Sequence, residues 1–297
     1  MSLALAPEFS MRVRRDEPLS RHTSWHVGGP AELFFTPRDV ADLAAFLRSV
    51  PRETPVCFLG LGSNLLVRDG GLKGVVISTQ GTLDALARRS ETEVHAQAGV
   101  VCAQLARACV RWGLGPAEFF AGIPGTLGGA LAMNAGAFGG ETWQHVRTVE
   151  IIDRSGRIHA RTAADYRVSY RRVVAPQPDE WFIAATLGFE CRPGAHSGEV
   201  QTLLARRKES QPIGEWSCGS VFTNPPGDHA ARLIEAAGLK GFRLGDASVS
   251  QKHANFIINH GGASAADLER LIGHVRAEVQ RVHGVALDPE VRIVGVP

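Results

Sequence analysis

A run of glycines in the middle of the 297-residue chain constrains its fold more than any other feature. Residues 119–141 read FFAGIPGTLGGALAMNAGAFGGE, and seven of them are glycine: Gly122, Gly125, Gly128, Gly129, Gly136, Gly139 and Gly140. Each glycine in a regular element costs roughly 0.5–1 kcal/mol relative to alanine, so the segment needs a compensating interaction. Two explanations fit. The segment packs closely against another backbone, or its N–H groups, at the start of a helix over residues 126–136, cradle an anion such as a pyrophosphate.

A second glycine-rich stretch, GLGSNL at residues 60–65, begins like the dinucleotide fingerprint G-x-G-x-x-G. Leu65 stands where the third glycine should be, and LLVRDGG after it resembles a strand rather than a helix. A Rossmann site is therefore not predicted. The stretch is either a tight turn or a loop where the backbone, Ser63 and Asn64 approach a phosphate.

Hydrophobic periodicity predicts a mixed α+β or α/β fold. Strands are expected over residues 31–37, 55–62, 73–79, 93–99, 181–190, 253–259 and 285–295, with a hairpin over 146–160 that turns at 154–156. Helices are expected over 38–50, 101–113, 199–212, 228–238 (N-cap Asp228) and 264–284, where Ser264 and Asp267 form a capping box. Proline and glycine cluster at 192–198, which marks a domain boundary.

Charge and cysteine content narrow the class of protein. The formal net charge of +2 and the scattered basic residues give no electrostatic reason to expect nucleic acid or an anionic membrane as partner. The five cysteines form no C-x-x-C, which favours a reducing compartment, and the histidines form no H-E-x-x-H, so no metal site is expected. The first residues lack a signal-peptide pattern, and no stretch approaches the roughly 18 apolar residues of a membrane helix. We expect a cytoplasmic monomer.

Three polar positions allow a functional or an ordinary interpretation. Ser220 in SCGSVFTN lies beside glycine without forming G-x-S-x-G, and no catalytic triad accompanies it. Arg167 and Arg171 in YRVSYR suit capture of a carboxylate or phosphate, or are solvated surface. Glu290 in LDPEVRIVG is either exposed at a sheet edge or buried with a shifted pKa.

Seven segments, in order, resemble the UDP-N-acetylenolpyruvoylglucosamine reductase family over nearly the whole chain. They are HTSWHVGGPAELFF, LGLGSNLLVRDGG, FFAGIPGTLGGALAMNAGAFGGE, YRVSY, SCGSVFTNP, LIEAAGLKGFRLGDASVSQKHANFIIN and LDPEVRIVG. The resemblance implies an α+β fold with a vanillyl-alcohol-oxidase-type (PCMH-type) FAD-binding module over 11–195, in subdomains of about 11–80 and 81–195, and a C-terminal α+β substrate-binding domain over 196–297. It also implies the short type of the family, without an extra substrate-covering loop that bears a tyrosine.

The resemblance assigns the glycine-rich stretches to FAD. The implied cofactor-binding residues are Gly60, Gly62, Ser63, Asn64, Leu65, Gly122, Ile123, Pro124, Gly125, Thr126, Gly128, Gly129, Ala130, Asn134 and Gly136. NADPH would be the hydride donor, and UDP-N-acetylglucosamine enolpyruvate would be reduced to UDP-N-acetylmuramate for peptidoglycan and cell-wall synthesis.

The resemblance also implies the roles of the polar residues. Ser220 would donate the proton that completes the reduction, so no triad is needed, while Arg167 and Glu290 would stabilise the enolate. Tyr166, Asn224 and Lys252 would contact the substrate's carboxylate or diphosphate. Two positions depart from the family pattern: Thr223 replaces a lysine and so removes a phosphate contact, and Cys218 replaces an alanine, which predicts sensitivity to oxidation.

Two other functions compete with this one. Another oxidoreductase on the same flavin fold would keep the glycine-rich loops but would not need Ser220, Arg167 and Glu290 together. A nucleotide-sugar-binding protein that has lost its flavin would be colourless.

Overall fold

The computed structural model describes residues 6–194 and 197–297, which separate into two compact units. Unit 1 contains residues up to Arg14, Leu33–Gly60 and Val75–Ala205, and unit 2 contains Arg15–Glu32, Leu61–Gly74 and Arg206–Pro297. The predicted boundary at residues 195–196 lies outside the described residues, so the domains 11–195 and 196–297 stay a prediction. The units are discontinuous in sequence because residues 15–32 and 61–74 pack with the C-terminal part of the chain.

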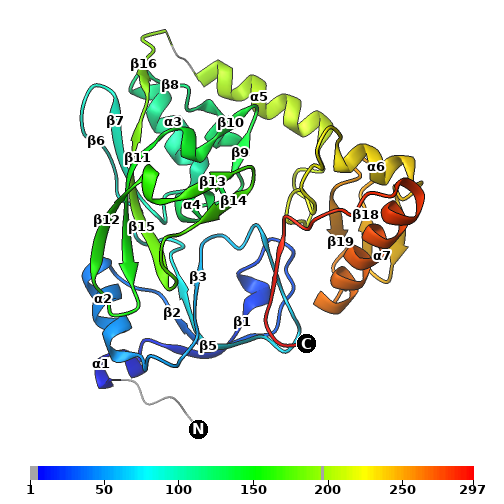
Figure 1. Ribbon diagram of the computed structural model, residues 1–297. Helices are drawn as coiled ribbons and strands as arrows, with labels where there is room; N and C mark the ends of the chain where they lie inside the picture. The colour runs from blue at the N-terminus through cyan, green and yellow to red at the C-terminus, as the bar shows by residue number, and fades with distance from the viewer. Residues whose placement is uncertain (1–5, 195–196) are drawn as a thin grey trace. The chain divides into compact units, whose positions relative to one another are not determined.

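A five-stranded antiparallel sheet forms the framework of unit 1, with the strand order β12-β11-β15-β7-β6 (Figure 1). Its strands are β6 (Leu86–Arg88), β7 (Glu93–Gln97), β11 (Val146–Asp153), β12 (Ile158–Thr162) and β15 (Glu180–Gly188). The expected hairpin is confirmed, because β11 and β12 pair across the turn that follows Asp153. Helices α3 (Cys102–Arg111) and α4 (Leu127–Met133) share a core with this sheet, built on buried Leu105, Leu127, Val149 and Leu187.

A second sheet has the order β1-β2-β5-β3, made of β1 (Arg14–Pro18), β2 (Pro30–Phe35), β3 (Val56–Leu59) and β5 (Leu72–Ser78). Strands β3 and β5 are parallel, with Val56 opposite Val75. Phe35 of β2 stacks on Phe46 of helix α2 (Val40–Ser49) at 3.8 Å between ring centroids, and Phe9 of α1 (Pro7–Ser10) packs on both rings. The strand-then-helix pattern of residues 31–50 therefore folds as expected.

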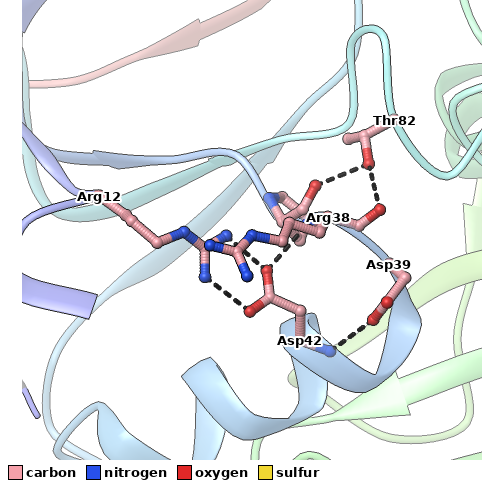
Figure 2. A network of polar contacts seen from close by, with 6 residues as sticks. Arg12, Arg38, Asp39, Asp42 and Thr82 are labelled. Carbon is pink, nitrogen blue, oxygen red and sulfur yellow. Dashed lines mark hydrogen bonds and ion pairs between the residues drawn. The ribbon is translucent and has the colours of Figure 1, made fainter. Parts of the chain in front are cut away.

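The N-terminus of α2 is held by the polar network drawn in Figure 2. Asp39 caps the helix by accepting a 2.8 Å hydrogen bond from the Asp42 N–H. The Asp42 carboxylate accepts two hydrogen bonds from the Arg12 guanidinium, at 2.8 and 2.7 Å, and one from the Arg38 N–H. The hydrogen bonds from Arg12 hold the pKa of Asp42 below its ordinary value of 3.8. Thr82 closes the network by donating to the carbonyl of Pro37.

Replacement of Asp42 by asparagine is expected to lower the free energy of unfolding at pH 7 by about 1.5–3 kcal/mol, the usual range for hydrogen bonds to a charged group. A pKa depressed by folding contributes stability that is present above the unfolded pKa and is lost as the pH falls through the folded value. The difference between wild type and Asp42→Asn should therefore shrink below about pH 4. Urea unfolding measures it, with the exposed Asp84→Asn as control. A constant difference down to the lowest pH at which both proteins fold would contradict the prediction.

Unit 2 is built around α7 (Ala265–His283), whose Leu268, Leu271 and Ile272 are buried beside Trp25 and Phe222. The capping box predicted at Ser264 and Asp267 is confirmed, and Gly284 ends the helix with φ +69°. An antiparallel sheet of β17 (Arg243–Leu244), β18 (Ala247–Val249) and β19 (Ile257–Asn259) lies in the same unit, and β4 (Leu65–Val67) pairs in parallel with β20 (Arg292–Val294). The last strand is thus shorter than the expected 285–295.

The N-cap predicted for the helix after residue 228 is wrong. Helix α6 spans Ala230–Ala236, and its N-cap position is His229. The Asn224 side chain accepts from the Ala230 N–H at 3.0 Å, whereas the Asp228 carboxylate accepts from His229 N–H and binds Arg232. A residue from outside the local pattern therefore caps α6.

The remaining elements of the described part of the chain are one further helix, the 3-10 turns and three two-stranded pairs. They are the helix α5 (Ser197–Ser210), the 3-10 turns η1 (Leu19–Arg21), η2 (Glu118–Gly122), η3 (Thr142–Gln144) and η4 (Ala163–Asp165), and the two-stranded pairs β8 (Leu114–Gly115) with β16 (Glu190–Cys191), β9 (Gly136–Ala137) with β10 (Gly140–Glu141), and β13 (Arg167–Ser169) with β14 (Arg172–Val174). Among the described residues, no helix has the length and apolar character needed to span a membrane.

Candidate active site

Close packing against another backbone, the first explanation offered for the glycine-rich segment, accounts for part of it in unit 1, whereas anion binding stays a prediction. The N–H groups of Leu127 and Gly128 donate at 2.8 Å to the carbonyls of Val100 and Ala98, so the start of α4 lies directly against the chain that follows β7. A Cβ at Gly128 would lie 2.9 Å from the Ala98 Cβ, which explains the glycine there by close packing. A Cβ at Gly129 would meet no atom within 4 Å, so this backbone is open to a ligand.

Gly60, the first residue of the 60–65 stretch, contacts the other glycine-rich segment within unit 1. A Cβ on Gly60 would lie only 2.5 Å from the Oγ1 of buried Thr126, so only glycine allows this approach. Of the other predicted cofactor-binding residues in the segment, Pro124 and Gly129 are exposed and Gly128 and Gly136 are half-buried, whereas Gly122, Ile123, Gly125 and Ala130 are buried. The open backbone at Gly129 leaves room for a phosphate-bearing cofactor, whereas the buried members pack within the protein.

The side chain of Asn134 has a structural role. It is buried, it ends α4 in the left-handed conformation at φ +50°, and it donates hydrogen bonds to Glu141 Oε2 and to the carbonyl of Ser169. Its Oδ1 accepts from the Trp143 N–H at 3.1 Å. The predicted cofactor contact of this residue is therefore not available from its side-chain amide.

Tyr166 and Arg167 begin the hairpin of β13 and β14 in unit 1. The Tyr166 ring is buried against Trp143, with 4.7 Å between centroids, and its hydroxyl has no hydrogen-bond partner in the described protein. Burial, assisted by the charge of Glu180, raises the pKa of Tyr166 to about 12, so the group stays a neutral donor. Arg167 is exposed, and its guanidinium makes no hydrogen bond or ion pair with any residue that the structure describes.

In unit 2 the structure brings three predicted segments together. The Glu290 N–H donates to the Val221 carbonyl at 2.8 Å, which places Glu290 beside the Ser220 loop. The Asn64 amide donates to the Glu290 carbonyl at 3.1 Å, and Leu65 lies opposite Arg292 in the parallel pair of β4 and β20. Segments around residues 64, 220 and 290, far apart in sequence, therefore form one local structure.

The loop around Ser220 leaves its hydroxyl available. The Ser220 side chain is half-buried and makes no hydrogen bond within residues 6–194 and 197–297. Gly219 precedes it with φ +80° and open space around its Cβ position, so the glycine is required by backbone conformation rather than by close packing. Gly62 is required by both: its φ is +61°, and a Cβ would lie 2.0 Å from the His22 carbonyl. Ser63 beside it is half-buried.

The two other predicted substrate-binding residues in unit 2 already have protein partners. Asn224 caps α6, as described above, and the Lys252 ammonium donates to the Lys208 carbonyl near the end of α5. Both side chains are exposed enough to turn toward a ligand, but they would exchange these hydrogen bonds for it. The Thr223 hydroxyl likewise donates to the Asp288 carbonyl at 3.3 Å.

The predicted sensitivity of Cys218 to oxidation is at odds with its burial. Only 5% of the residue is exposed, and burial, reinforced by the charge of Glu290, raises the pKa of its thiol well above the ordinary value. Oxidation and alkylation require the thiolate and access to it. Cys218 is therefore expected to be inert in the folded protein.

A brief pulse of N-ethylmaleimide at pH 7.5 should label Cys191, which is exposed, and leave Cys102, Cys109 and Cys218 unmodified. Burial raises the pKa of Cys102 and of Cys109 to about 12, which suppresses their reactivity further. Peptide mass spectrometry reads the labels, and the Cys191→Ser variant should lose the fast phase. Fast labelling of Cys218 in the native protein would restore the oxidation hypothesis.

Asn255, which the sequence analysis did not single out, supports the loop around Ser220. Asn255 is buried and bonds both the N–H and the carbonyl of Phe222, and thereby fixes the loop two residues after Ser220. An asparagine within the apolar run HANFII was the available signal. In the described residues, no cluster of three or more histidine, cysteine, aspartate or glutamate side chains could hold a metal.

Two family models match the chain. The model described as "UDP-N-acetylenolpyruvoylglucosamine reductase, C-terminal domain" matches residues 211–294, and the model described as "FAD binding domain" matches residues 31–161. The matched ranges contain Ser220 and Glu290 in the first case and both glycine-rich stretches in the second.

Curated and solved proteins give the same result over the full length. The UDP-N-acetylenolpyruvoylglucosamine reductase of Alkalilimnicola ehrlichii is 62% identical over 286 residues, with 95% of each chain covered, and that of Methylococcus capsulatus is 55% identical, covering 94% of this chain and 92% of its own. The crystal structure of UDP-N-acetylenolpyruvylglucosamine reductase from Thermus caldophilus superposes with a TM-score of 0.78 at 32% identity, covering 95% of this chain and 98% of its own.

Proposed function

The chain belongs to the UDP-N-acetylenolpyruvoylglucosamine reductase family, and from that premise we propose how its residues carry out the family's reaction. The protein is an FAD-dependent oxidoreductase that uses NADPH to reduce UDP-N-acetylglucosamine enolpyruvate to UDP-N-acetylmuramate, a step of peptidoglycan synthesis. The single observation that supports the residue assignment most directly is the local structure of unit 2, where Asn64, the Ser220 loop and Glu290 are joined by hydrogen bonds.

FAD, when bound, supplies the hydride that NADPH has delivered to it. We assign its contacts to the open backbone at Gly129 and its neighbours Pro124, Gly128 and Gly136, and to residues 60–65. Buried Gly122, Ile123, Gly125, Thr126, Ala130 and Asn134 hold that backbone in place. The close approach of Gly60 to Thr126 supports this assignment, because it places Gly60 beside the start of α4 within unit 1.

The protein's own groups supply the proton and the charge stabilisation. Ser220 donates a proton to the enolate carbon, a role suited to a hydroxyl that has no acceptor among residues 6–194 and 197–297. Arg167 offers an uncompensated cation to the substrate carboxylate, where negative charge accumulates. Glu290, from its fixed place beside Val221, takes part in the same stabilisation by keeping a proton on its carboxyl group, which donates a hydrogen bond where the negative charge develops. The hydroxyl of Tyr166 is a buried donor that has no hydrogen-bond partner in the described part of the chain, and it gains one when a substrate oxygen binds.

The proposal also covers the binding of the diphosphate, the location and oligomeric state of the enzyme, and its type within the family. Asn224 and Lys252 bind the substrate's diphosphate after giving up their hydrogen bonds in the protein. The enzyme works as a cytoplasmic monomer, in keeping with five free cysteines. It is of the short type, and the only two tyrosines of the chain, Tyr166 and Tyr170, both lie in or next to β13 rather than in a covering loop.

An anaerobic visible spectrum tests the function. The purified protein should show flavin absorbance that bleaches with NADPH and returns when UDP-N-acetylglucosamine enolpyruvate is added. A flavin that bleaches but is not reoxidised by the sugar nucleotide would favour another oxidoreductase on the same fold. A colourless protein that takes up no FAD would favour the binding protein.

A further inference from the structure

Arg171 lies in the turn between β13 and β14 and binds the backbone at the end of α4. Its Nη1 donates to the Asn134 carbonyl at 3.2 Å and its Nη2 donates to the Gly136 carbonyl at 2.9 Å. The residue is half-buried and has a left-handed backbone with φ +55°. The sequence allowed an anion ligand or a solvated side chain here, and the structure adds a third role, binding of backbone carbonyls. The guanidinium instead connects the hairpin to the glycine-rich segment.

Two further contacts fix the same hairpin to the same segment. The Asn134 amide donates to the Ser169 carbonyl at 3.2 Å, at the end of β13. Tyr166 packs against Trp143 with the two rings tilted, and the Trp143 indole N–H donates to the Leu131 carbonyl of α4 at 2.8 Å. In Figure 1, β13, β14 and α4 lie together in the green part of the chain. Contacts before and after Arg167 in the sequence therefore hold the hairpin against the glycine-rich segment.

Arg167 lies between these anchors and has no polar partner of its own among the described residues. A long, exposed side chain without partners is positioned only by the backbone that carries it. We propose that Arg171 is a positioning residue that fixes the β13–β14 hairpin against α4. It thereby fixes the Arg167 guanidinium, the candidate carboxylate-binding group, relative to the candidate cofactor-binding backbone. The proposal rests on the function assigned to Arg167 above.

The Arg171→Met variant of the holoenzyme tests this, with Arg172→Met as a matched control. Arg172 is the adjacent residue of the same hairpin, has the same charge and is exposed. A displacement of about 1 Å in a positioning element can cost about 10²-fold in rate. We expect Arg171→Met to slow reoxidation by UDP-N-acetylglucosamine enolpyruvate by about 10- to 100-fold. The FAD content and the rate of bleaching by NADPH should stay near wild type, as should all properties of Arg172→Met.

A double-mutant cycle separates positioning from a general structural effect. In an Arg167→Met background, Arg171→Met should cause no further loss of reoxidation rate, because the group that it positions is gone. A readout without turnover is the Kd of UDP-N-acetylmuramate for the oxidised holoenzyme, which should rise in Arg171→Met and not rise again in the double variant. The same fold-loss in both backgrounds, or equal losses in the two half-reactions, would overturn the proposal.

A more conservative variant covers the case in which Arg171→Met does not retain FAD. Arg171→Lys keeps the charge but cannot bind two carbonyls with one planar group, so it should give an intermediate loss of reoxidation rate. In that case a wild-type reoxidation rate in Arg171→Lys would refute positioning. If the wild-type enzyme itself were not reoxidised by the sugar nucleotide, the proposed function would fail instead.

Discussion

Replacement of Ser220 by alanine is expected to slow reoxidation of the reduced enzyme by UDP-N-acetylglucosamine enolpyruvate by about 10²- to 10⁴-fold, the usual contribution of a positioned general acid. The variant removes one hydroxyl that has no hydrogen-bond partner in the described protein, so the free energy of unfolding should barely change. Bleaching by NADPH needs no proton from Ser220 and should proceed at the wild-type rate. Stopped-flow absorbance of the flavin measures the two half-reactions separately.

The control for this variant is Ser217→Ala. Ser217 is half-buried in the same loop, three residues before Ser220, and has no assigned role. Its replacement should leave both half-reactions unchanged. Ser220→Ala with wild-type reoxidation would remove the serine from the mechanism, and an equal loss in both half-reactions would indicate that the loop, rather than a proton, had been disturbed.

The main helices and four of the five strands of the sheet in unit 1 were predictable because their signals are local, whereas β6 and the pairing order were not predicted. The apolar face of residues 264–284, bounded by Ser264 and Gly284, gives α7 almost residue by residue. The cap of α6 was not predictable, because Asn224 reaches it from outside the helix and displaces Asp228 from that role. The same holds for the short β20, whose pairing with β4 depends on a contact between residues more than two hundred positions apart.

The candidate site likewise contains features that the sequence predicted and features that only the structure shows. Its glycines were recognisable from density alone, but their separate causes were not: Gly128 faces Ala98, Gly129 faces open space, and Gly219 depends on a positive φ. Arg167 and Arg171 were equivalent in the sequence, four residues apart in one polar segment. The resemblance assigned a role to Arg167 alone, and the fold adds the physical difference, because the Arg171 guanidinium binds backbone carbonyls and the Arg167 guanidinium has no polar partner among the described residues.

Glu290→Gln is expected to lower the rate of reoxidation by about 10²- to 10³-fold, the usual cost of removing one group that stabilises developing negative charge. The substitution is close to isosteric. The contacts that place the residue, from its N–H to Val221 and from Asn64 to its carbonyl, involve the backbone and should persist. The variant therefore tests the carboxyl group and not the position of the chain, and its rate of bleaching by NADPH should match wild type.

The matched control for the carboxyl group is Asp288→Asn. Asp288 is exposed two residues earlier in the same segment, and its backbone carbonyl, which the substitution keeps, accepts from the Thr223 N–H at 3.0 Å. The Asp288→Asn variant should have the wild-type rate in both half-reactions. If Glu290→Gln reoxidised as fast as wild type, the carboxyl group would have no part in stabilising the enolate, and Arg167 would be left as the charged group assigned to that task. If bleaching by NADPH fell as much as reoxidation, Glu290 would serve the loop around Ser220 rather than the chemistry.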